Sequence, residues 1–279
     1  MRKALDQLKS QIATFKDIGA LSDSAWQKIS QKVTVLLMAG GEGARFTAVA
    51  QGQEVNKNSF VLPNNDTMIE MCIRLYKKSG ITNFVALLYH KAESIENLLG
   101  DGTKYGVNIK YSYDPGKPVG KGGAVKHAFE NNLIPNDHYI VVHNPDDVIL
   151  DYPGDFPREV ISGHLAGEKS GALASVVVVE ETPHQFSAMK VSNSFVDQIE
   201  MYPMIPLPTH IGITVFSPNI QQMFIELFNY EKKEDFEKKL FPILSEKRKL
   251  YAIKISTNCW LAVNNPKSFQ DLLKRLNLV

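Results

Sequence analysis

The chain alternates between short apolar runs and amphipathic stretches over most of its length. Val33–Met38 is a continuous apolar run, which is typical of a buried parallel strand. Further apolar runs predict strands over 84–89, 107–113, 138–143 and 172–179. Stretches with helical spacing lie between them and predict helices over 67–79, 92–99 and 122–131. Strands that alternate with such helices form βαβ units, so we expect a Rossmann-like three-layer α/β sandwich with a mostly parallel central sheet.

The second half of the chain is richer in strand patterns. Short strands, some of them antiparallel, are expected over 186–191, 195–200, 210–216 and 250–255. Helices are expected over 218–228, 234–246 and 266–276. Because the sequence shows no internal repeat and no low-complexity segment, we predict a single domain over residues 33–279.

Residues 1–32 precede this pattern and predict a helical arm. Apolar residues recur there at spacings of three and four, as on one face of a helix; they are Leu5, Leu8, Ile12 and Phe15. Gly19 interrupts this helix, and Ser22 or Ser24 can cap a second, shorter one that carries Trp26. We expect the arm to pack on the main domain. An oligomerisation or partner-binding hairpin is the alternative.

Composition and charge exclude several classes of protein. Hydrophobic residues make up 44% of the 279 residues and charged residues 22%, which argues against disorder. The net charge of +1 gives no general attraction to nucleic acid or to an anionic membrane, so we expect neither as a partner. No apolar run approaches the roughly 20 residues that cross a bilayer. The two cysteines, Cys72 and Cys259, form no CxxC motif, and we expect a reducing, cytoplasmic location.

A glycine-rich loop with the sequence AGGEGAR, Ala39–Arg45, directly follows the first predicted strand. Its glycines allow close approach to a ligand, and consecutive amides can cradle phosphate oxygens. The loop is not a Walker A motif, and it lacks the third glycine and the helix of a dinucleotide fingerprint. The planar cation of Arg45 suits a polyphosphate that undergoes transfer. The alternative is a glycine-rich turn with a surface arginine.

Three further segments carry candidate chemistry. Lys57 lies in a loop, where a lysine alone is most often solvated, and it gains interest from the glycine-rich loop before it. Val119–Ala124, with the sequence VGKGGA, opens a predicted helix whose free amides favour an anion or a base edge, unless its glycines serve tight packing. His143–Asp147 follows the fourth strand, where ligands of open α/β sheets bind. Its two carboxylates suit Mg²⁺, with an Asx-type turn as the alternative.

These segments, in this order, resemble the sugar-1-phosphate nucleotidyltransferases, also called nucleotide-sugar pyrophosphorylases, over roughly residues 33–276. Weaker matches follow at Thr67–Glu70, His210–Ile213 and Trp260–Ala262. The resemblance implies a Mg²⁺-dependent reaction in which a sugar 1-phosphate attacks the α-phosphorus of a nucleoside triphosphate. Pyrophosphate leaves and a nucleotide-sugar forms. The resemblance leaves homo-oligomer formation open.

The resemblance also implies roles for single residues. Arg45 would neutralise the departing pyrophosphate, and Lys57 would stabilise the transferred phosphate. Asp147, with Asp146 as the alternative, would hold Mg²⁺. The nucleotide would contact both glycine-rich segments, through Ala39, Gly40, Gly41, Gly43, Gly120, Gly122 and Gly123. The sugar phosphate would contact Lys190, Glu200 and Gly212.

The chain departs from the family pattern on the acceptor side. Ala262 replaces a late aspartate that usually shares the metal, Met201 replaces a lysine that usually grips the sugar phosphate, and Ala188 replaces a glycine beside the sugar. The phosphate-binding half is intact. Two alternatives therefore stand beside an active enzyme. One is a catalytically impaired regulatory or binding protein on the same fold, and the other is a CTP-dependent transferase for a polyol or aminoalkyl phosphate.

Overall fold

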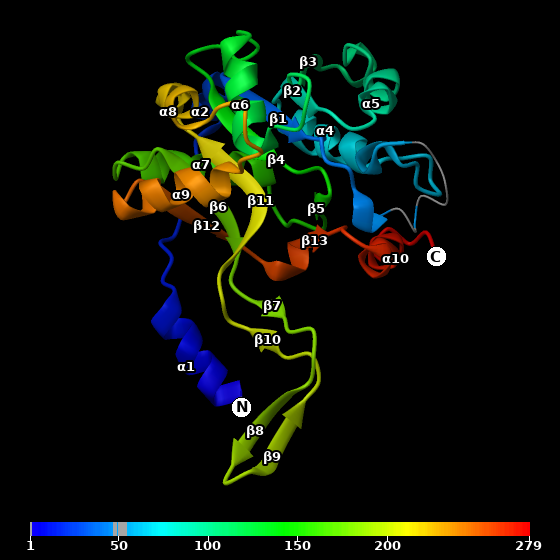
Figure 1. Ribbon diagram of the computed structural model, residues 1–279. Helices are drawn as coiled ribbons and strands as arrows, with labels where there is room; N and C mark the ends of the chain where they lie inside the picture. The colour runs from blue at the N-terminus through cyan, green and yellow to red at the C-terminus, as the bar shows by residue number, and fades with distance from the viewer. Residues whose placement is uncertain (1, 47–48, 50–54) are drawn as a thin grey trace.

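The computed structural model describes residues 2–46, 49 and 55–279. A seven-stranded sheet forms its centre, with the strand order β12-β6-β11-β4-β1-β2-β3 (Figure 1). Its strands are β1 Val33–Met38, β2 Asn83–Leu88, β3 Asn108–Tyr113, β4 Tyr139–His143, β6 Ala174–Val179, β11 Thr209–Phe216 and β12 Leu250–Ile255. β11 runs antiparallel to β4 and β6, and the other neighbours are parallel. The predicted Rossmann-like sandwich with a mostly parallel sheet is confirmed.

Helices cover both faces of the sheet and enclose two apolar cores. On one face lie α4 Met68–Lys78, α5 Ala92–Leu99 and α7 Phe156–Glu168, and on the other lie α6 Gly120–Glu130, α8 Gln221–Leu227 and α9 Phe236–Glu246. Val35 and Leu37 of β1 enter the first core and Leu36 enters the second, because successive strand residues point to opposite faces. A third cluster packs α10 Pro266–Arg275 against the short 3₁₀ helix η1 Ala44–Phe46.

The sequence pattern did not predict α7, and its two glycines explain why. Glycine lowers helix propensity by about 1 kcal/mol relative to alanine. A Cβ atom at Gly163 would lie 2.9 Å from the Ile253 side chain, and one at Gly167 would lie 2.7 Å from the Tyr251 ring. Asp155 caps the helix by accepting the backbone N–H of Arg158. The glycines therefore serve the close packing of α7 on β12.

The predicted N-terminal arm divides into two helices with different surroundings. α1 spans Arg2–Ile12, and α2 spans Asp23–Ser30 with Ser22 as its N-cap. Trp26 of α2 is buried, and its indole nitrogen donates to the carbonyl of Ser79 at 2.9 Å. Leu8 and Ile12 of α1 are exposed instead. The expected packing on the main domain thus holds for α2, and a domain boundary at residue 32 stays a prediction.

The remaining elements are short, and most of them lie beyond the central sheet. β8 Ala188–Ser192 and β9 Phe195–Glu200 form a hairpin that projects from the body (Figure 1). At its base β7 Thr182–Pro183 pairs with β10 Met204–Ile205, while β5 Asp147–Ile149 pairs with β13 Trp260–Ala262. Further 3₁₀ helices are η2 Lys57–Ser59, η3 Thr103–Tyr105, η4 Pro218–Ile220 and η5 Thr257–Cys259. Among the described residues, no helix has the length and apolarity to span a membrane.

Candidate active site

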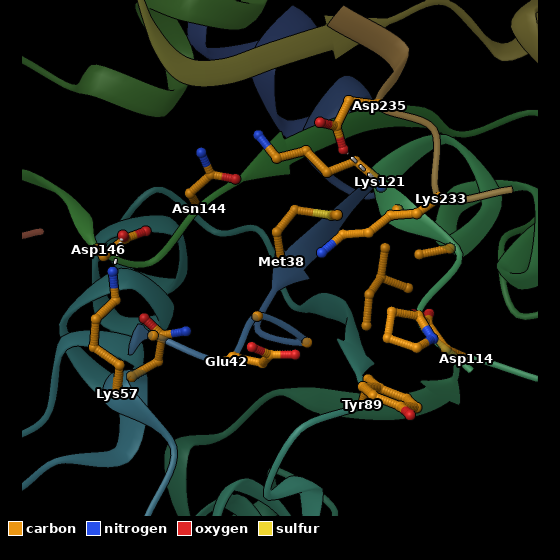
Figure 2. A pocket seen from close by; sticks show the side chains of 18 residues that line it. Met38, Glu42, Lys57, Tyr89, Asp114, Lys121, Asn144, Asp146, Lys233 and Asp235 are labelled. Carbon is orange, nitrogen blue, oxygen red and sulfur yellow. Dashed lines mark hydrogen bonds and ion pairs between the residues drawn. The ribbon is translucent and has the colours of Figure 1, made fainter. Parts of the chain in front are cut away.

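A pocket of about 300 Å³ opens at the carboxyl ends of the central parallel strands (Figure 2). Residues at or just after the ends of these strands line it, namely Met38, Leu87, Tyr89, Asp114 and Asn144. The glycine-rich loop and the start of α6 complete its wall. Ligands of open α/β sheets bind at this end of the strands. The pocket is therefore the first candidate for a substrate site.

The glycine-rich loop approaches the pocket through its backbone. Gly40, Gly41 and Gly43 all line the pocket. Gly43 has a φ of +63°, a conformation that side chains rarely adopt, and a Cβ atom there would lie 3.2 Å from the Cβ of Lys57. Ala39 is buried instead, and its N–H extends the sheet by donating to the Leu87 carbonyl at 3.0 Å.

Arg45, the predicted catalytic arginine, belongs to η1 at the end of this loop. Its side chain lies outside the part of the chain that the structure describes, so its catalytic role stays a prediction.

Lys57 enters the pocket from η2 and forms an ion pair with Asp146 (Figure 2). The two side chains are only 13% and 16% exposed. Two neutral oxygens also lie near the Lys57 ammonium, the Asn264 amide oxygen at 3.3 Å and the Val263 carbonyl at 3.4 Å. Removing either partner of an ion pair that is largely buried leaves the other charge uncompensated and out of water, which is strongly destabilising. Lys57 is thus held among oxygen atoms at one end of the pocket.

Asn56 fixes the position of Lys57. Its side-chain nitrogen donates to the Ala39 carbonyl at 2.8 Å and to the His90 carbonyl at 2.9 Å. Its side-chain oxygen accepts the N–H of Asn58 and caps η2. This buried amide joins the glycine-rich loop, the end of β2 and the lysine loop into one unit.

The two predicted metal ligands lie in different environments. Asp146 lines the pocket, whereas Asp147 is buried behind it. The carboxylate of Asp147 accepts hydrogen bonds from Trp260 Nε1 and from Asn144 Nδ2, both at 3.0 Å. Burial, with repulsion from Asp146, raises the pKa of Asp147 to about 7. Asp146 is consequently the carboxylate that faces the pocket.

Gly212 serves the buried network around Asp147. Its φ of +74° favours glycine, and a Cβ atom there would overlap the Asp147 carboxylate and the Asn144 amide. The Asn144 N–H also donates to the Gly212 carbonyl at 3.3 Å. Gly212 therefore leaves room for the Asp147 and Asn144 side chains, of which Asn144 lines the pocket.

The three glycines at the start of α6 have different roles. Gly120 lines the pocket with a φ of +75°, and a Cβ atom there would lie 2.6 Å from the Glu234 backbone. A Cβ atom at Gly122 would overlap the Phe228 ring, and one at Gly123 would lie 2.7 Å from the Val119 side chain. Gly122 and Gly123 are buried by this packing and do not line the pocket.

Two residues predicted to bind the sugar phosphate lie away from the pocket. Lys190 is on β8 and Glu200 ends β9, so both belong to the projecting hairpin. The Lys190 ammonium lies 3.8 Å from the Asp197 carboxylate on the same hairpin. Neither lines the pocket, and their sugar-phosphate role stays a prediction.

The pocket also contains charged and aromatic residues that were not predicted as site residues. They are Glu42, Tyr89, Asp114, Lys121, Lys233 and Asp235 (Figure 2). Tyr89 and Asp114 each directly follow a central strand, and this position in the sequence could have identified them as pocket residues. Lys233 and Asp235 come from the segment between α8 and α9, which only the tertiary structure brings to the pocket.

Asp114 joins the wall to the start of α6. Its carboxylate accepts the Val119 N–H at 3.1 Å, and burial raises the pKa of Asp114. The Lys121 ammonium donates to the Glu237 carboxylate at 2.5 Å. Figure 2 shows Asp114 and Tyr89 at one end and Lys57 with Asp146 at the other. The pocket thus has an aromatic and acidic end and a lysine end.

The residues present fit a divalent cation through oxygen atoms alone. No cluster of three His, Cys, Asp or Glu side chains with metal-binding geometry occurs among the described residues. Asp146, the Asn264 amide oxygen and the Val263 carbonyl surround the Lys57 ammonium. Carboxylate and neutral oxygens of this kind suit Mg²⁺, which commonly takes one or two carboxylates and completes its shell with phosphates and water.

The family model described as nucleotidyl transferase matches residues 34–277 of the chain. A mannose-1-phosphate guanyltransferase from Saccharomyces cerevisiae is 26% identical over 84% of this chain and 62% of its own length. A low-salt glycan biosynthesis nucleotidyltransferase from Haloferax volcanii is 30% identical over 66% of this chain and 49% of its own. The chain thus spans less than two thirds of the length of these curated relatives.

A crystal structure from Bacillus anthracis, described as a glucose-1-phosphate thymidylyltransferase in complex with a sucrose, superimposes with a TM-score of 0.64. The match covers 87% of this chain and 95% of that one, at 19% identity. This similarity shows that the two proteins share a fold.

Proposed function

The chain belongs to the nucleotidyl transferase family, and we propose that it condenses a nucleoside triphosphate with a sugar 1-phosphate to give a nucleotide-sugar and pyrophosphate. The observation that carries this proposal is that Gly40, Gly41, Gly43, Lys57 and Asp146 all line a single pocket. Backbone amides and a lysine can hold a triphosphate there. The far end of the pocket, with Tyr89 and Asp114, then receives the nucleobase.

The reaction forms one bond and breaks another at the same phosphorus. A phosphate oxygen of the sugar 1-phosphate attacks the α-phosphorus, and the bridging oxygen leaves with pyrophosphate. This displacement needs alignment and charge neutralisation more than a covalent nucleophile. The Lys57 ammonium neutralises charge that develops on the α-phosphate, and Arg45 is proposed to do so on pyrophosphate.

Lys57 and Asp146 cannot keep their ion pair unchanged while both serve the reaction. A bound triphosphate competes with Asp146 for the ammonium, because it presents several negative charges to the same lysine. We place Mg²⁺ at Asp146 and not at Asp147, whose two oxygens already accept hydrogen bonds. Mg²⁺, when bound, supplies charge neutralisation across the phosphates. Asn264 and the Val263 carbonyl offer oxygens near the position where Ala262 has none.

Guanine is the base that the far end of the pocket favours. The guanine edge presents adjacent N1–H and N2–H donors that a carboxylate can accept together, whereas uracil and thymine offer one N–H between two acceptors. Asp114 supplies such a carboxylate, and Tyr89 offers a ring for stacking. The name guanyltransferase of the yeast relative points to the same base, and its name gives mannose 1-phosphate as the first acceptor to test.

The sugar phosphate has other cationic partners if the projecting hairpin does not reach it. Lys121 and Lys233 both line the pocket, whereas Lys190 and Glu200 do not. We propose that these pocket lysines contribute to acceptor binding. Gly212 contributes indirectly, through the positions of Asn144 and Asp147.

A binding or regulatory protein on the same fold is the second candidate. The observation in its favour is that Lys57 neutralises Asp146 and that Ala262, which pairs with Asp147, adds no carboxylate. Such a protein binds nucleotide without releasing pyrophosphate. The same assay separates the two candidates.

The deciding experiment measures pyrophosphate release with Mg²⁺, for each nucleoside triphosphate paired with sugar, polyol and aminoalkyl phosphates. We expect turnover with GTP and a hexose 1-phosphate. Lys57→Met should lower it by about 10² to 10³-fold, the usual loss for a charge-stabilising group. Lys32→Met is the matched control, because Lys32 pairs with Asp137 on the exposed surface. Nucleotide binding without turnover in any pair would support the second candidate instead.

A further inference from the structure

Asn58 carries a buried amide oxygen that has no hydrogen-bond donor. The residue follows Lys57 in η2 and is only 5% exposed, yet it lines the pocket. Among the described residues, three buried side-chain atoms lack a hydrogen-bond partner, and the other two belong to Arg158 and Glu237. Neither of those two is among the described residues that line the pocket. Because nearly all buried polar groups in proteins are paired, an unpaired one at a binding pocket needs an explanation.

The segment that carries Asn58 is held by hydrogen bonds of its neighbours. The Asn58 N–H donates to the Asn56 amide oxygen at 3.0 Å. The buried Ser59 hydroxyl lies 3.1 Å from the Asn56 carbonyl and 3.0 Å from the Ser94 hydroxyl, within hydrogen-bond distance of both. These contacts pair the polar side chains on both sides of Asn58 and leave its amide oxygen as the exception. The oxygen is therefore held in place at the pocket before a ligand binds, which lowers the entropic cost of pairing with one.

The chemistry of the pocket limits which ligand group can pair with this oxygen. An amide oxygen accepts hydrogen bonds and donates none. The ionised oxygens of a triphosphate also only accept, so they cannot supply the donor. The Lys57 ammonium already pairs with Asp146. The N–H donors of a base belong to the other end of the pocket, where Figure 2 shows Tyr89 and Asp114. A hydroxyl group, of the ribose or of the sugar, is the donor that remains.

The position next to Lys57 favours the sugar over the ribose. In the proposed reaction Lys57 neutralises the α-phosphate, which becomes bonded to the sugar phosphate. Figure 2 shows Lys57 at the end of the pocket away from the base, so the sugar belongs to the lysine end. Asn144 adds a second amide to the pocket wall, and its nitrogen donates to the Asp147 carboxylate at 3.0 Å. Its oxygen is then the end of that amide which a further hydroxyl can reach.

We propose that Asn58 is a specificity-determining residue, whose amide oxygen accepts a hydrogen bond from a hydroxyl group of the sugar phosphate. The inference rests on the proposed function and narrows its acceptor. The acceptor carries a hydroxyl group close to its phosphate, as sugar and polyol phosphates do. An aminoalkyl phosphate without a hydroxyl leaves the Asn58 oxygen buried and unpaired, which weakens binding. Asn58 thus selects hydroxylated acceptors among compounds that share the same phosphate group.

The first experiment measures ligand binding to the full chain by titration calorimetry with Mg²⁺. The ligand is the nucleotide-sugar that the substrate pair with turnover produces, GDP-mannose for the expected pair. Its analogues lack one sugar hydroxyl at a time, or a ribose hydroxyl. One sugar-deoxy analogue should bind about 10-fold more weakly than the parent compound. Asn58→Leu, a change of similar size, should weaken the parent compound by about the same factor and remove the difference between the two.

Asn108→Leu is the matched control for this experiment. Asn108 is exposed at the start of β3, the end of the strand that lies away from the pocket, so the variant should keep the difference between the two compounds. Asn58→Asp retains an acceptor oxygen and should keep it as well. In the free protein, Asn58→Leu should leave the unfolding temperature unchanged or raise it, because it removes a buried polar atom without a partner.

Several outcomes overturn the inference. One is an Asn58→Leu protein that still discriminates between the parent compound and every deoxy analogue, whether or not its unfolding temperature falls. Another is a loss that only the ribose analogues show, because that assigns the oxygen to the nucleotide. An equal loss for all compounds that disappears on chelation of Mg²⁺ assigns it to a metal-bound water. A blank pyrophosphate assay overturns the proposed function, whereas turnover with equal binding of all sugar analogues overturns this inference alone.

Discussion

At the scale of single residues, the pocket depends on positions where only a small or oriented group fits. Gly120 and Gly212 both adopt positive φ, and a side chain at either would meet atoms of the pocket wall. Asn56 uses both ends of its amide to connect the glycine-rich loop to the lysine loop, and the Asn144 amide nitrogen donates to the Asp147 carboxylate. Lys57 and Asp146 then present opposite charges from neighbouring loops. The site is thus set by hydrogen bonds and backbone conformation more than by the number of charges.

Gly212→Ala should destabilise the protein markedly. The substitution forces a side chain into the left-handed region, which costs about 1 to 2 kcal/mol, and it displaces the buried Asp147 carboxylate. We expect the free energy of unfolding to fall by about 2 to 4 kcal/mol in urea denaturation. Gly19→Ala is the control, since no atom lies within 4 Å of a Cβ atom there. A loss no larger than that of the control would contradict the tight packing described for Gly212.

The buried His164 makes stability depend on pH. Its ring nitrogens hydrogen-bond Ser175 and Ser217 at 2.9 and 3.0 Å, and burial lowers the pKa of His164 to about 4. Because an unfolded histidine titrates near pH ~6.5, the unfolded state binds more protons between these two values. Stability should therefore fall as pH drops through this window, by on the order of 3 kcal/mol for His164.

Urea unfolding at a series of pH values tests this, with His164→Gln as the comparison. The difference between the two proteins isolates His164 from other titrating groups. His143, whose pKa burial also lowers to about 4, acts in the same direction. Asp147, with its raised pKa of about 7, acts in the opposite direction, since its stabilisation is lost as pH rises. A pH-independent difference would show that His164 is not held neutral by burial.

At the scale of elements, the two helices of the N-terminal arm differ in how much they pack on the central domain. α2 contributes the buried Trp26 to the first core, whereas α1 leaves Leu8 and Ile12 exposed. Lys9 of α1 lies 3.5 Å from Glu180, an exposed ion pair of small energetic value. α2 therefore belongs to the folded domain in energetic terms, and α1 adds little to its stability.

Trp26→Ala and Leu8→Ala test this difference between the two helices. Removing the buried indole should cost about 3 to 5 kcal/mol, as is usual for large aromatic side chains in a core. Leu8→Ala should change the free energy of unfolding by no more than about 0.5 kcal/mol. Chemical denaturation measures both. A comparable loss in the two variants would mean that α1 also packs on the domain.

At the scale of the whole molecule, the glycine-rich loop, η2 and the ends of β1, β2, β3 and β4 meet at one pocket, so a ligand that binds there contacts segments that are far apart in the chain. Binding to the folded state alone stabilises it by mass action. A nucleotide at about a hundred times its dissociation constant adds about 2.7 kcal/mol. The unfolding temperature thus reports binding without requiring turnover.

We expect Mg²⁺ with GTP to raise the unfolding temperature, and Lys57→Met to remove most of that shift. Part of this shift should depend on Mg²⁺ and disappear when a chelator removes the metal. Asp146→Asn should reduce that Mg²⁺-dependent part, because Asp146 is the carboxylate that faces the pocket. Asp147→Asn serves as the comparison, since Asp147 is buried behind the pocket. If Asp147→Asn alone removes the Mg²⁺-dependent part, the metal belongs to Asp147 and the assignment to Asp146 is wrong.

The sequence by itself determined the sheet, most of its helices and the loops that surround the pocket. Apolar runs such as Val33–Met38 specify buried strands, because a strand covered on both faces needs hydrophobic residues at every position. The alternation of strands with helices then specifies the βαβ order. The glycine-rich loop could be located because it directly follows such a strand, and Lys57 gained interest from that loop and from the family resemblance. The sequence did not predict α7, because its two glycines lower helix propensity. Their reason is close packing against Ile253 and Tyr251, which are far along the chain.

Only the tertiary structure decided which of the predicted residues share the pocket. Asp146 and Asp147 are neighbours in sequence, yet one faces the pocket and the other is buried, because β5 pairs with β13 and turns alternate residues to opposite sides. Lys233 reaches the pocket from a distant loop, and Lys190 is carried away from it on the hairpin. Residue types and periodicity record local preferences, whereas these placements depend on contacts between segments far apart in the chain.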